Sequence, residues 1–334
     1  MAKNNNLHNA KRAKNDEFYT RLEEIENELK YYKAHFAGKV VYCNCDDARE
    51  SNFFRFFQKK FNDYGLKKLI TTSYNENGHG SVLVYEGDTN GNGKLDDTEI
   101  KVSELKGNGD FRSEECIELL KEADIVVTNP PFSLFRDYIA TLVQYDKKFL
   151  IIGNTNAITY KEVFPLIKEN KLWLGWSSFN KGMYFYVPED YKYADTYKFE
   201  KEINGRKVMR VSSICWFTNL DHSRRHEDLI LYKKYTPEEY PKYDNYDAIE
   251  VSQMINLPKD YEGIIGIPIT GLKYLWDDGT IHCNIDGKTS QFEIVGLTSS
   301  SKECTYGLLL SENQSTRAKI NSKYIYARLL IKKK

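Results

Sequence analysis

Ala123-Asp124-Ile125-Val126-Val127-Thr128-Asn129-Pro130-Pro131-Phe132 is a segment that predicts a buried strand ending in a rigid turn. Asp124 to Thr128 contains a branched apolar run without a turn residue, which is typical of a strand inside a sheet. The two prolines fix two φ angles and remove two backbone donors, and they bias Asn129 away from a helical conformation. Open α/β sheets place their ligands at the carboxyl ends of strands, so this turn is a candidate site.

The residue types of the turn suit catalysis on the exocyclic amino group of a purine. That nitrogen is a poor nucleophile because its lone pair is delocalised into the ring. An asparagine oxygen and a proline carbonyl can accept its two hydrogens and draw it toward tetrahedral geometry, while a phenylalanine stacks on the base. The candidate catalytic residues are Asn129, Pro130, Pro131 and Phe132. A rigid strand-to-helix turn without chemistry is the alternative that the segment alone leaves open.

Composition limits the class of protein. The chain has 334 residues, so it can bury a sizeable core in one large domain or in a domain with a smaller appendage. Lys and Arg together number 48, as do Asp and Glu, so a nucleic-acid partner would have to be held by local basic patches. No apolar run reaches the roughly 20 residues of a membrane span, and the N-terminus lacks a signal peptide. The six cysteines form no C-x-x-C pair, which predicts reduced packing thiols in a cytoplasmic protein.

Strands and helices alternate along the first half of the chain. The expected strands are 40–44, 69–73, 82–85, 124–128 and 149–152, and the expected helices are 23–35, 52–61, 113–121 and 135–145. Ser113 is the expected cap of the third of these helices. This alternation predicts an α/β fold with a doubly wound, mostly parallel sheet. After Trp173 the pattern changes to antiparallel strands, expected at 183–187 and 211–217, and to short strands at 263–269 and 291–297. We therefore divide the chain into a basic N-terminal arm at 1–15, a domain at 16–232 and a C-terminal region at 233–334.

The polar stretch from Asp88 to Glu99 fits the pattern of a calcium-binding loop. It carries oxygen-bearing residues at positions one, three, five, nine and twelve and glycine at position six. The preceding segment reads as a strand, whereas a calcium loop of this type follows a helix. We expect a polar hairpin loop and no metal site, with calcium binding as the alternative.

Several segments, in this order, resemble the adenine-specific DNA methyltransferases of the EcoRI modification type. They are Asp16-Glu17-Phe18-Tyr19-Thr20, the turn from Cys45 to Phe53, Gly109-Asp110-Phe111, the segment 123–132, and the stretches 263–270 and 292–297. The resemblance covers about Asp16 to Leu297. It implies the fold of S-adenosylmethionine-dependent methyltransferases with a C-terminal DNA target-recognition region. It also implies transfer of a methyl group from S-adenosylmethionine to the exocyclic amino group of a flipped-out adenine in double-stranded DNA.

The resemblance also assigns roles to individual residues. Those implied to hold the cofactor are Phe18, Tyr19, Thr20, Asp46, Asp47, Ser51, Asp110 and Phe111. Those implied to contact the target base are Phe132, Tyr184 and Phe185. The first cofactor segment would close over the methionine end, one of the paired aspartates would face the amino-acid part, and the Asp-Phe pair would read the cofactor's adenine. Each segment also has a structural interpretation: a helix start, a Gly-Asp turn or an aromatic strand core.

The chain departs from the family pattern at two cofactor positions. Ser51 stands where relatives usually carry glycine, and no Gly-x-Gly is present, so close backbone approach to the cofactor is not assured. No acidic residue clearly follows the second strand to bind the ribose, and Glu76 is the nearest one.

Double-stranded DNA is the expected partner. We expect a monomer without a membrane partner, and the resemblance allows for a cognate restriction endonuclease in the same system. A methyltransferase acting on RNA bases or protein glutamine stays open, as does a catalytically silent DNA-binding module. The scattered Lys, Arg and Tyr of the last ~100 residues favour a nucleic acid over a peptide. The intact segment 129–132 argues against the silent module.

Overall fold

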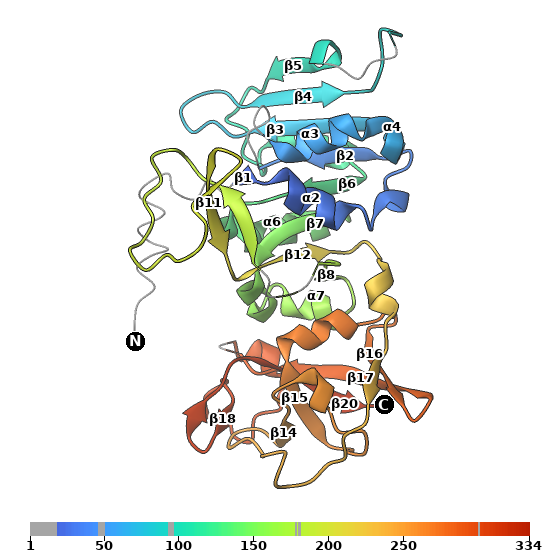
Figure 1. Ribbon diagram of the computed structural model, residues 1–334, viewed down its shortest axis with the longest axis vertical. Helices are drawn as coiled ribbons and strands as arrows, with labels where there is room; N and C mark the ends of the chain where they lie inside the picture. Colours follow the sequence, from blue (N-terminus) through green and yellow to red (C-terminus); the bar gives the residue numbers. More distant parts are fainter. Residues whose placement is uncertain (1–18, 46–50, 93–96, 178, 180–181, 300) are drawn as a thin grey trace. The chain divides into compact units, whose positions relative to one another are not determined.

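A computed structural model describes residues 19–45, 51–92, 97–177, 179, 182–299 and 301–334. The chain divides into two compact units (Figure 1). Unit 1 comprises Met1–Asn154 and Ser177–Trp216, and unit 2 comprises Thr155–Trp176 and Phe217–Lys334. Unit 2 therefore contains all of the region 233–334 and further segments that precede it in the sequence.

The main sheet of unit 1 has four parallel strands at its centre, in the order β3-β2-β6-β7. Its strands are β2 (Val40–Cys43), β3 (Lys68–Ser73), β4 (Ser81–Tyr85), β5 (Lys101–Glu104), β6 (Ile125–Thr128), β7 (Lys148–Asn154) and β12 (Ile214–Thr218). The parallel sheet that we predicted is confirmed at this centre. At the edge β4 and β5 are antiparallel, and the sequence did not predict β5. The turn 74–80 is too short for a parallel connection, which needs about a dozen residues or more.

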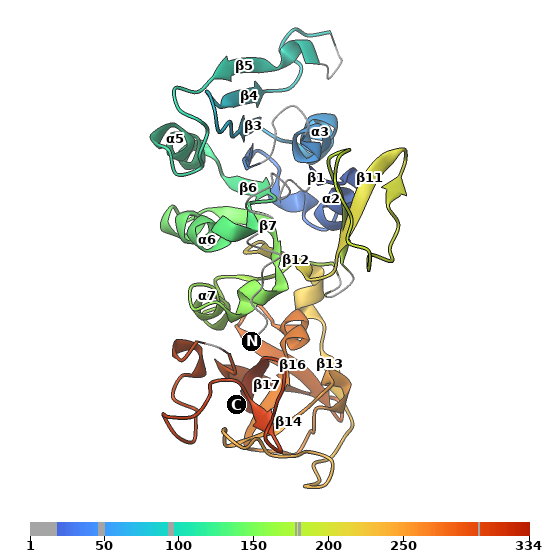
Figure 2. The same ribbon diagram turned by 90° about the vertical axis from the view of Figure 1, so that its left-hand side faces the viewer.

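Helices cover both faces of this sheet, because parallel strands are joined by helical crossovers. The helices of unit 1 are α2 (Leu22–Leu29), α3 (Asn52–Lys59), α4 (Phe61–Tyr64), α5 (Glu114–Glu122) and α6 (Phe135–Gln144). Figure 2 shows α5 and α6 on one face and α2 and α3 on the other. Every residue of β2 and β6 is buried as a result. Four phenylalanines of α3 are buried, as expected from its Phe-rich sequence.

Local side-chain contacts explain where several elements begin. The Ser113 hydroxyl accepts a hydrogen bond from the Cys116 amide at 3.3 Å, which confirms the predicted cap of α5. Asp124 accepts a hydrogen bond from the Val40 amide at 2.8 Å, and the Asp124 amide donates to the Val40 carbonyl at 2.9 Å. This pair fixes the register of β6 on β2. The first helix ends at Leu29, before the predicted end, and a short 3₁₀ turn (Lys33–His35) follows it.

A second, antiparallel sheet in unit 1 has the order β1-β9-β11-β10. Its strands are β1 (Tyr19–Thr20), β9 (Met183–Tyr186), β10 (Glu202–Ile203) and β11 (Arg206–Val211). The antiparallel strand expected at 183–187 is confirmed as β9. The single strand expected at 211–217 is wrong: Val211 ends β11, and a new strand, β12, begins at Ile214.

Unit 2 is built on a six-stranded sheet with the order β13-β16-β17-β20-β15-β14. The strands of this sheet are β13 (Leu229–Leu231), β14 (Ala248–Glu250), β15 (Ile264–Pro268), β16 (Thr280–Ile285), β17 (Lys288–Leu297) and β20 (Arg328–Lys333). Outside it, unit 2 contains α7 (Phe164–Lys168), β8 (Trp173–Leu174), which pairs with β12, and β18 (Lys319–Ile320), which pairs with β19 (Lys323–Tyr324). The strands predicted at 263–269 and 291–297 are confirmed as β15 and β17. No helix in the described part of either unit has the length and apolar character needed to cross a membrane.

Candidate active site at the carboxyl end of β6

The turn predicted to be catalytic follows β6, at the carboxyl end of a strand in the centre of the sheet. Asn129 is half-buried, Pro130 is buried and Pro131 is exposed. The Pro131 carbonyl accepts a hydrogen bond from the Leu134 amide at 2.9 Å, which closes the 3₁₀ turn η3 (Phe132–Leu134). Among the described residues the Pro130 carbonyl has no hydrogen-bond partner. The two prolines therefore differ in their hydrogen bonding: the Pro131 carbonyl closes the turn, whereas the Pro130 carbonyl accepts no hydrogen bond within the described residues.

The ring of Phe132 is half-buried at the start of η3. It contacts no other aromatic ring of the described residues. A phenylalanine with a partly exposed face beside a polar turn can stack on a planar ligand.

A buried hydrogen-bond network joins β6 to β2 next to this turn. Asn44, the residue after β2, is 3% exposed. Its carbonyl accepts a hydrogen bond from the Thr128 hydroxyl, and its side-chain oxygen accepts one from the Tyr138 hydroxyl on α6. Burial raises the pKa of Tyr138, so its hydroxyl remains a donor. The Tyr138 ring packs edge-on against Phe111 with the centroids 5.0 Å apart, so the network also reaches a predicted cofactor residue.

Asn44 and Tyr138 are not among the residues predicted from the sequence. One signal was available for Asn44, since a polar residue directly after a buried parallel strand lies at the edge where ligands bind. For Tyr138 there was none, because its partner is 94 positions away in the sequence.

Pairing of β1 with β9 brings a predicted cofactor segment beside a predicted substrate segment. Thr20 is the Cα partner of Phe185, and Tyr19 is the partner of Tyr186. Thr20 is 1% exposed, and its carbonyl accepts a hydrogen bond from the Asn52 side chain at 2.7 Å. The Thr20 hydroxyl has no hydrogen-bond partner within the described residues. A buried hydroxyl in this state is a candidate contact for a polar ligand.

Tyr184 and Phe185 point to opposite sides of β9, as successive residues of a strand do. Phe185 is fully buried, whereas Tyr184 is half-buried. The Tyr184 amide donates to a carboxylate oxygen of Glu24 at 3.1 Å, which ties β9 to α2. Of these two rings, Tyr184 is the one with a surface accessible to a base.

Ser51 acts as the cap of α3. Its hydroxyl accepts a hydrogen bond from the Phe54 amide at 3.4 Å, and the residue is 1% exposed. Its side chain thus has a structural contact at the start of a helix that follows β2. The other predicted cofactor residues Phe18, Asp46 and Asp47 lie outside the described residues.

Asp110 is held by its neighbour Arg112, which the sequence analysis did not identify. The Arg112 side chain donates to both carboxylate oxygens, with Nε 2.9 Å from Oδ1 and one terminal nitrogen 2.6 Å from Oδ2. These hydrogen bonds hold the pKa of the Asp110 carboxyl below its usual range. The carboxylate is therefore ionised and oriented, and its remaining lone pairs can accept further hydrogen bonds.

A tight packing contact places this segment at the carboxyl end of β3. Gly109 has φ +83°, and a Cβ atom there would lie 2.2 Å from the carbonyl oxygen of Ser73. The Asn75 amide also donates to the Asn108 carbonyl at 2.8 Å. Only glycine fits at position 109, so the position of Asp110 depends on it.

We expect Gly109→Ala to lower the free energy of unfolding by about 2–4 kcal/mol, because it combines a left-handed φ with a backbone clash. Urea denaturation measures this change. Gly107→Ala is the matched control, since φ at Gly107 is not positive and the nearest atom to an added Cβ is 3.8 Å away. Equal stability of the two variants would contradict the close packing of Gly109 on β3.

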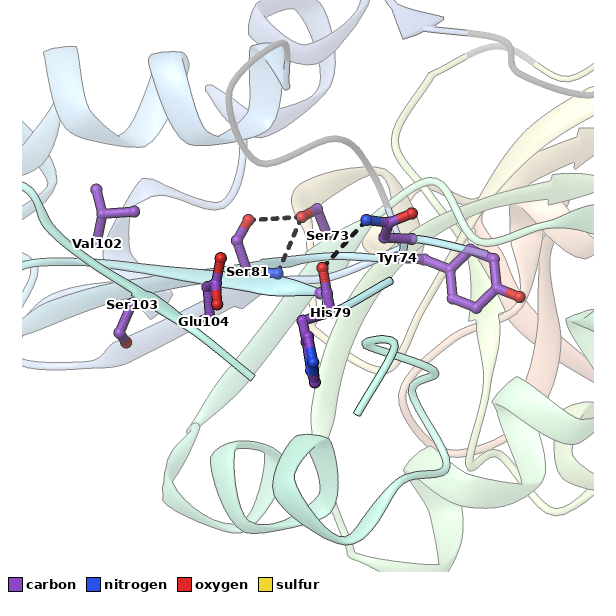
Figure 3. Close-up of a pocket in the computed structure, with 9 residues that line it drawn as sticks. Ser73, Tyr74, His79, Ser81, Val102, Ser103 and Glu104 are labelled. Carbon is purple, nitrogen blue, oxygen red and sulfur yellow. Dashed lines mark hydrogen bonds between the residues drawn. The ribbon is translucent and has the colours of Figure 1, made fainter. Parts of the chain in front are cut away.

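A hollow of about 650 Å³ lies where β3, β4 and β5 meet (Figure 3). It is lined by Ser73, Tyr74, Asn75, His79, Gly80, Ser81, Val102, Ser103 and Glu104. The lining is mostly polar, and the Ser73 and Ser81 hydroxyls lie 2.6 Å apart. None of the predicted site residues lines it, so we place the candidate site at the ends of β2 and β6 on the chemistry of the residues there.

The described part of the Asp88–Glu99 loop is held by its own hydrogen bonds. Asp88 accepts from the amides of Gly91 and Asn92 at 2.7 and 3.1 Å. Glu99 is 5% exposed and accepts from the Thr89 amide at 2.6 Å. No group of three or more His, Cys, Asp or Glu side chains among the described residues could hold a metal ion. Positions 93–96 lie outside those residues, so the polar hairpin stays a prediction.

We expect calcium chloride to leave the melting temperature unchanged, because a polar hairpin offers no folded-state ion site. An ion that binds only the folded state would raise stability with its concentration. Magnesium chloride at equal ionic strength is the control. We also expect replacement of the loop by a short Gly-Ser turn to leave intact the methyl transfer that the resemblance implies, since the loop residues supply nothing that methyl transfer needs. A large increase in melting temperature at micromolar calcium would establish an ion site instead.

Similarity to a protein family and to individual relatives places the chain among known proteins. Residues 6–334 match the sequence profile of the family described as "Adenine-specific methyltransferase EcoRI". The chain is 52% identical over 281 residues to the type II methyltransferase M.EcoRI of Escherichia coli, a match that covers 81% of this chain and 86% of the relative. It is 39% identical over 332 residues to the type II methyltransferase M.MgeORF184P of Mycoplasma genitalium, covering 97% of each. No solved structure was found to match.

Proposed function

We propose that this chain, which belongs to the EcoRI family of adenine-specific methyltransferases, takes a methyl group from S-adenosylmethionine. It transfers that group to the exocyclic amino group of a flipped-out adenine. The observation that carries the proposal is the position of Asn129-Pro130-Pro131-Phe132 directly after the buried parallel strand β6. The substrate is double-stranded DNA. The relatives' description as type II methyltransferases supports a partner endonuclease in a restriction-modification system.

The arrangement of unit 1 supports this assignment of fold and donor. Four parallel strands with helices on both faces form an open α/β sheet, in which ligands bind at the carboxyl ends of the strands. The carboxyl ends of β2 and β6 are joined through Asn44 and carry the candidate residues. We assign residues 16–232 to donor binding and catalysis, and 233–334 to recognition of the DNA target.

Residues present at this edge fit S-adenosylmethionine chemically. The buried hydroxyl of Thr20 can bind a polar group of the methionine end, because it has no other hydrogen-bond partner in the described structure. The Asp110 carboxylate, oriented by Arg112, can accept a hydrogen bond from the amino group of the donor's adenine. Phe111 offers an apolar face, and its packing on Tyr138 fixes its ring. Phe18, Tyr19, Asp46, Asp47 and Ser51 complete the proposed cofactor set.

When bound, the cofactor supplies an electrophilic methyl group on a positively charged sulfur. The protein's task is to make the adenine nitrogen nucleophilic and to aim its lone pair at that methyl carbon. Asn129 Oδ1 and the Pro130 carbonyl accept the two amino hydrogens, which shifts electron density from the ring onto the nitrogen. A bound S-adenosylmethionine would give its methyl group to the nitrogen lone pair that these acceptors orient, and the electron pair of the C–S bond would stay on sulfur. One amino proton would then pass to solvent water, which leaves a neutral amine.

The two prolines keep the acceptors fixed during this step. The Pro131 carbonyl is bound to Leu134 and holds the turn, so the Pro130 carbonyl can face the substrate without reorganising. Preorganised acceptors stabilise the positive charge that develops on the nitrogen. Phe132 and Tyr184 are proposed to enclose the target base, with Phe185 supporting β9 from the core.

The proposal is tested by the labelled product. Incubation with tritiated methyl donor and genomic DNA should incorporate label into DNA, and methylation-sensitive sequencing should place it on adenine in one short sequence. Incorporation into RNA or protein instead, or none at all, would contradict the proposed substrate.

A further inference from the structure

A short β-hairpin in unit 2 carries a group of basic residues on one face and beside its turn. Residues 315–326, here called the basic hairpin, include β18 and β19, which pair antiparallel. The segment contains the three cations Arg317, Lys319 and Lys323 and no Asp or Glu. Its turn residues Asn321 and Ser322 have φ values of 48° and 65°, as expected in a two-residue hairpin turn.

The hairpin backbone is anchored by side chains from a preceding segment. The Asp244 carboxylate accepts hydrogen bonds from the amides of Asn321 and Ser322 at 3.1 and 2.7 Å. Asn245 is 2% exposed, and its amide nitrogen donates to two carbonyls of the hairpin at 2.6 and 2.9 Å. Tyr246 donates to a third carbonyl at 2.6 Å. These contacts hold the hairpin in one conformation before any ligand arrives.

One face of the hairpin belongs to the core of unit 2. Ala318 is 1% exposed and lies in a buried cluster with Tyr243, Tyr246 and Leu330. The partly buried side chains of Ile320 and Ile325 pack against that cluster. The orientation of the other face is therefore fixed by packing.

The opposite face carries Arg317, Lys319 and Tyr324, whereas the exposed Lys323 lies beside the turn as the cross-strand partner of Ile320. Tyr326 is 88% exposed and Tyr324 is 51% exposed. The Arg317 guanidinium and the Lys319 ammonium lie 4.8 and 4.7 Å from the centroid of the Tyr324 ring. These two tyrosine rings do not contribute to the packing of the core, because both are exposed to solvent.

The three cations of the hairpin form no salt bridge with any carboxylate in the described part of the chain. Two other lysines of unit 2 do have acidic partners: Lys302 lies 3.7 Å from Glu312, and Lys333 lies 3.1 Å from Glu262. Positive side chains that lack acidic partners and are held on a rigid hairpin can bind a ligand with closely spaced negative charges. Duplex DNA carries one charge per about 1.7 Å of its axis.

We propose that the basic hairpin is a DNA-contact surface, on which Arg317, Lys319 and Lys323 bind backbone phosphates and the Tyr326 ring packs against a sugar or base. The inference rests on the proposed function, because it takes duplex DNA as the substrate. The fixed backbone lowers the entropic cost of ordering these side chains on the duplex. Phosphate contacts position the protein without reading sequence, whereas a ring in a groove contacts the bases themselves.

The charge contribution is measured with the triple variant Arg317→Gln, Lys319→Gln and Lys323→Gln. Fluorescence anisotropy with a labelled duplex gives affinity at several salt concentrations. We expect the slope of log affinity against log salt to become shallower by about 2.7, at 0.9 per phosphate contact, with affinity loss on specific and random DNA alike. The double variant Lys302→Gln, Lys333→Gln is the matched control, since those lysines already have acidic partners.

The ring contribution is measured with Tyr326→Ala. We expect about a tenfold or greater loss of affinity, and recovery with Tyr326→Phe, which keeps the ring. Tyr232→Ala is the control, since that tyrosine is 57% exposed elsewhere in unit 2. The melting temperature should not change, because the Tyr326 side chain is almost entirely in solvent.

An unchanged salt slope in the triple variant, with unchanged affinity in Tyr326→Ala, would overturn the DNA-contact surface. If wild-type protein methylates adenine in DNA while these variants bind DNA as wild type does, only this inference fails. If wild-type protein methylates no DNA, the proposed function itself fails. Altered self-association of the variants without altered DNA binding would assign the hairpin to a second copy of the chain and likewise overturn the inference.

Discussion

Replacing Asn129 with alanine is expected to lower the turnover number for methyl transfer about 100-fold or more, with the affinity for S-adenosylmethionine nearly unchanged. The side-chain oxygen is assigned to an amino hydrogen of the target adenine, a contact that strengthens as the nitrogen gains positive charge. Its loss therefore raises the energy of the transition state more than that of the bound donor. Single-turnover kinetics at saturating donor and calorimetry of donor binding measure the two quantities separately.

Asn129→Asp is the control for this prediction, because a carboxylate keeps an acceptor oxygen at the same position. It should retain more activity than the alanine variant, whereas a purely structural asparagine would not favour aspartate over alanine in this way. Collapse of donor affinity in Asn129→Ala, with turnover preserved at saturating donor, would mean that Asn129 holds the cofactor and not the target base.

Replacing Phe132 with alanine is expected to weaken both specific DNA binding and turnover. A base inside the duplex hides its amino group, so the target must rotate out of the helix at a cost of a few kcal/mol. Stacking on an aromatic ring recovers on the order of 1–3 kcal/mol of that cost. Phe132 is half-buried at the start of η3, directly after the proposed acceptors, and we propose that its ring provides this stacking.

2-Aminopurine at the target position reports the rotation directly, because its fluorescence rises when it leaves the quenching base stack. We expect a rise on binding to wild-type protein and a smaller one with Phe132→Ala. Affinity for random DNA should stay the same, since it depends on phosphate contacts. Equal losses on specific and random DNA, or no fluorescence change with wild-type protein, would count against stacking on this ring.

The sequence predicted the centre of unit 1 because its signals there are local. The apolar run of β6, the prolines after it and the Ser113 cap each act within a few residues, and the structure places each as expected. The resemblance supplied the family, which the comparisons establish. Strand order at the edge was not predictable, because β5 is exposed along its whole length and lacks the apolar pattern of a strand.

Residues whose contacts lie far away in the sequence were not predicted. Asn44 and Tyr138 lie 94 positions apart and meet only because β2 and α6 pack in the folded chain. Arg112 is two positions from Asp110, yet its bidentate contact depends on the turn that Gly109 permits. A list of residue types cannot show which carboxylate is already held and which hydroxyl is left without a partner.

Identification of the methylated atom tests the central claim most directly. DNA treated with the protein and isotopically labelled S-adenosylmethionine is digested to nucleosides, which are separated by liquid chromatography against methylated standards and identified by mass spectrometry. If Asn129 and Pro130 activate the amino group as proposed, the label is expected on the exocyclic amino nitrogen of adenine. It is expected to be lost in Asn129→Ala. Label on a ring nitrogen of adenine, on cytosine, or undiminished in Asn129→Ala would contradict the assignment of this turn to catalysis.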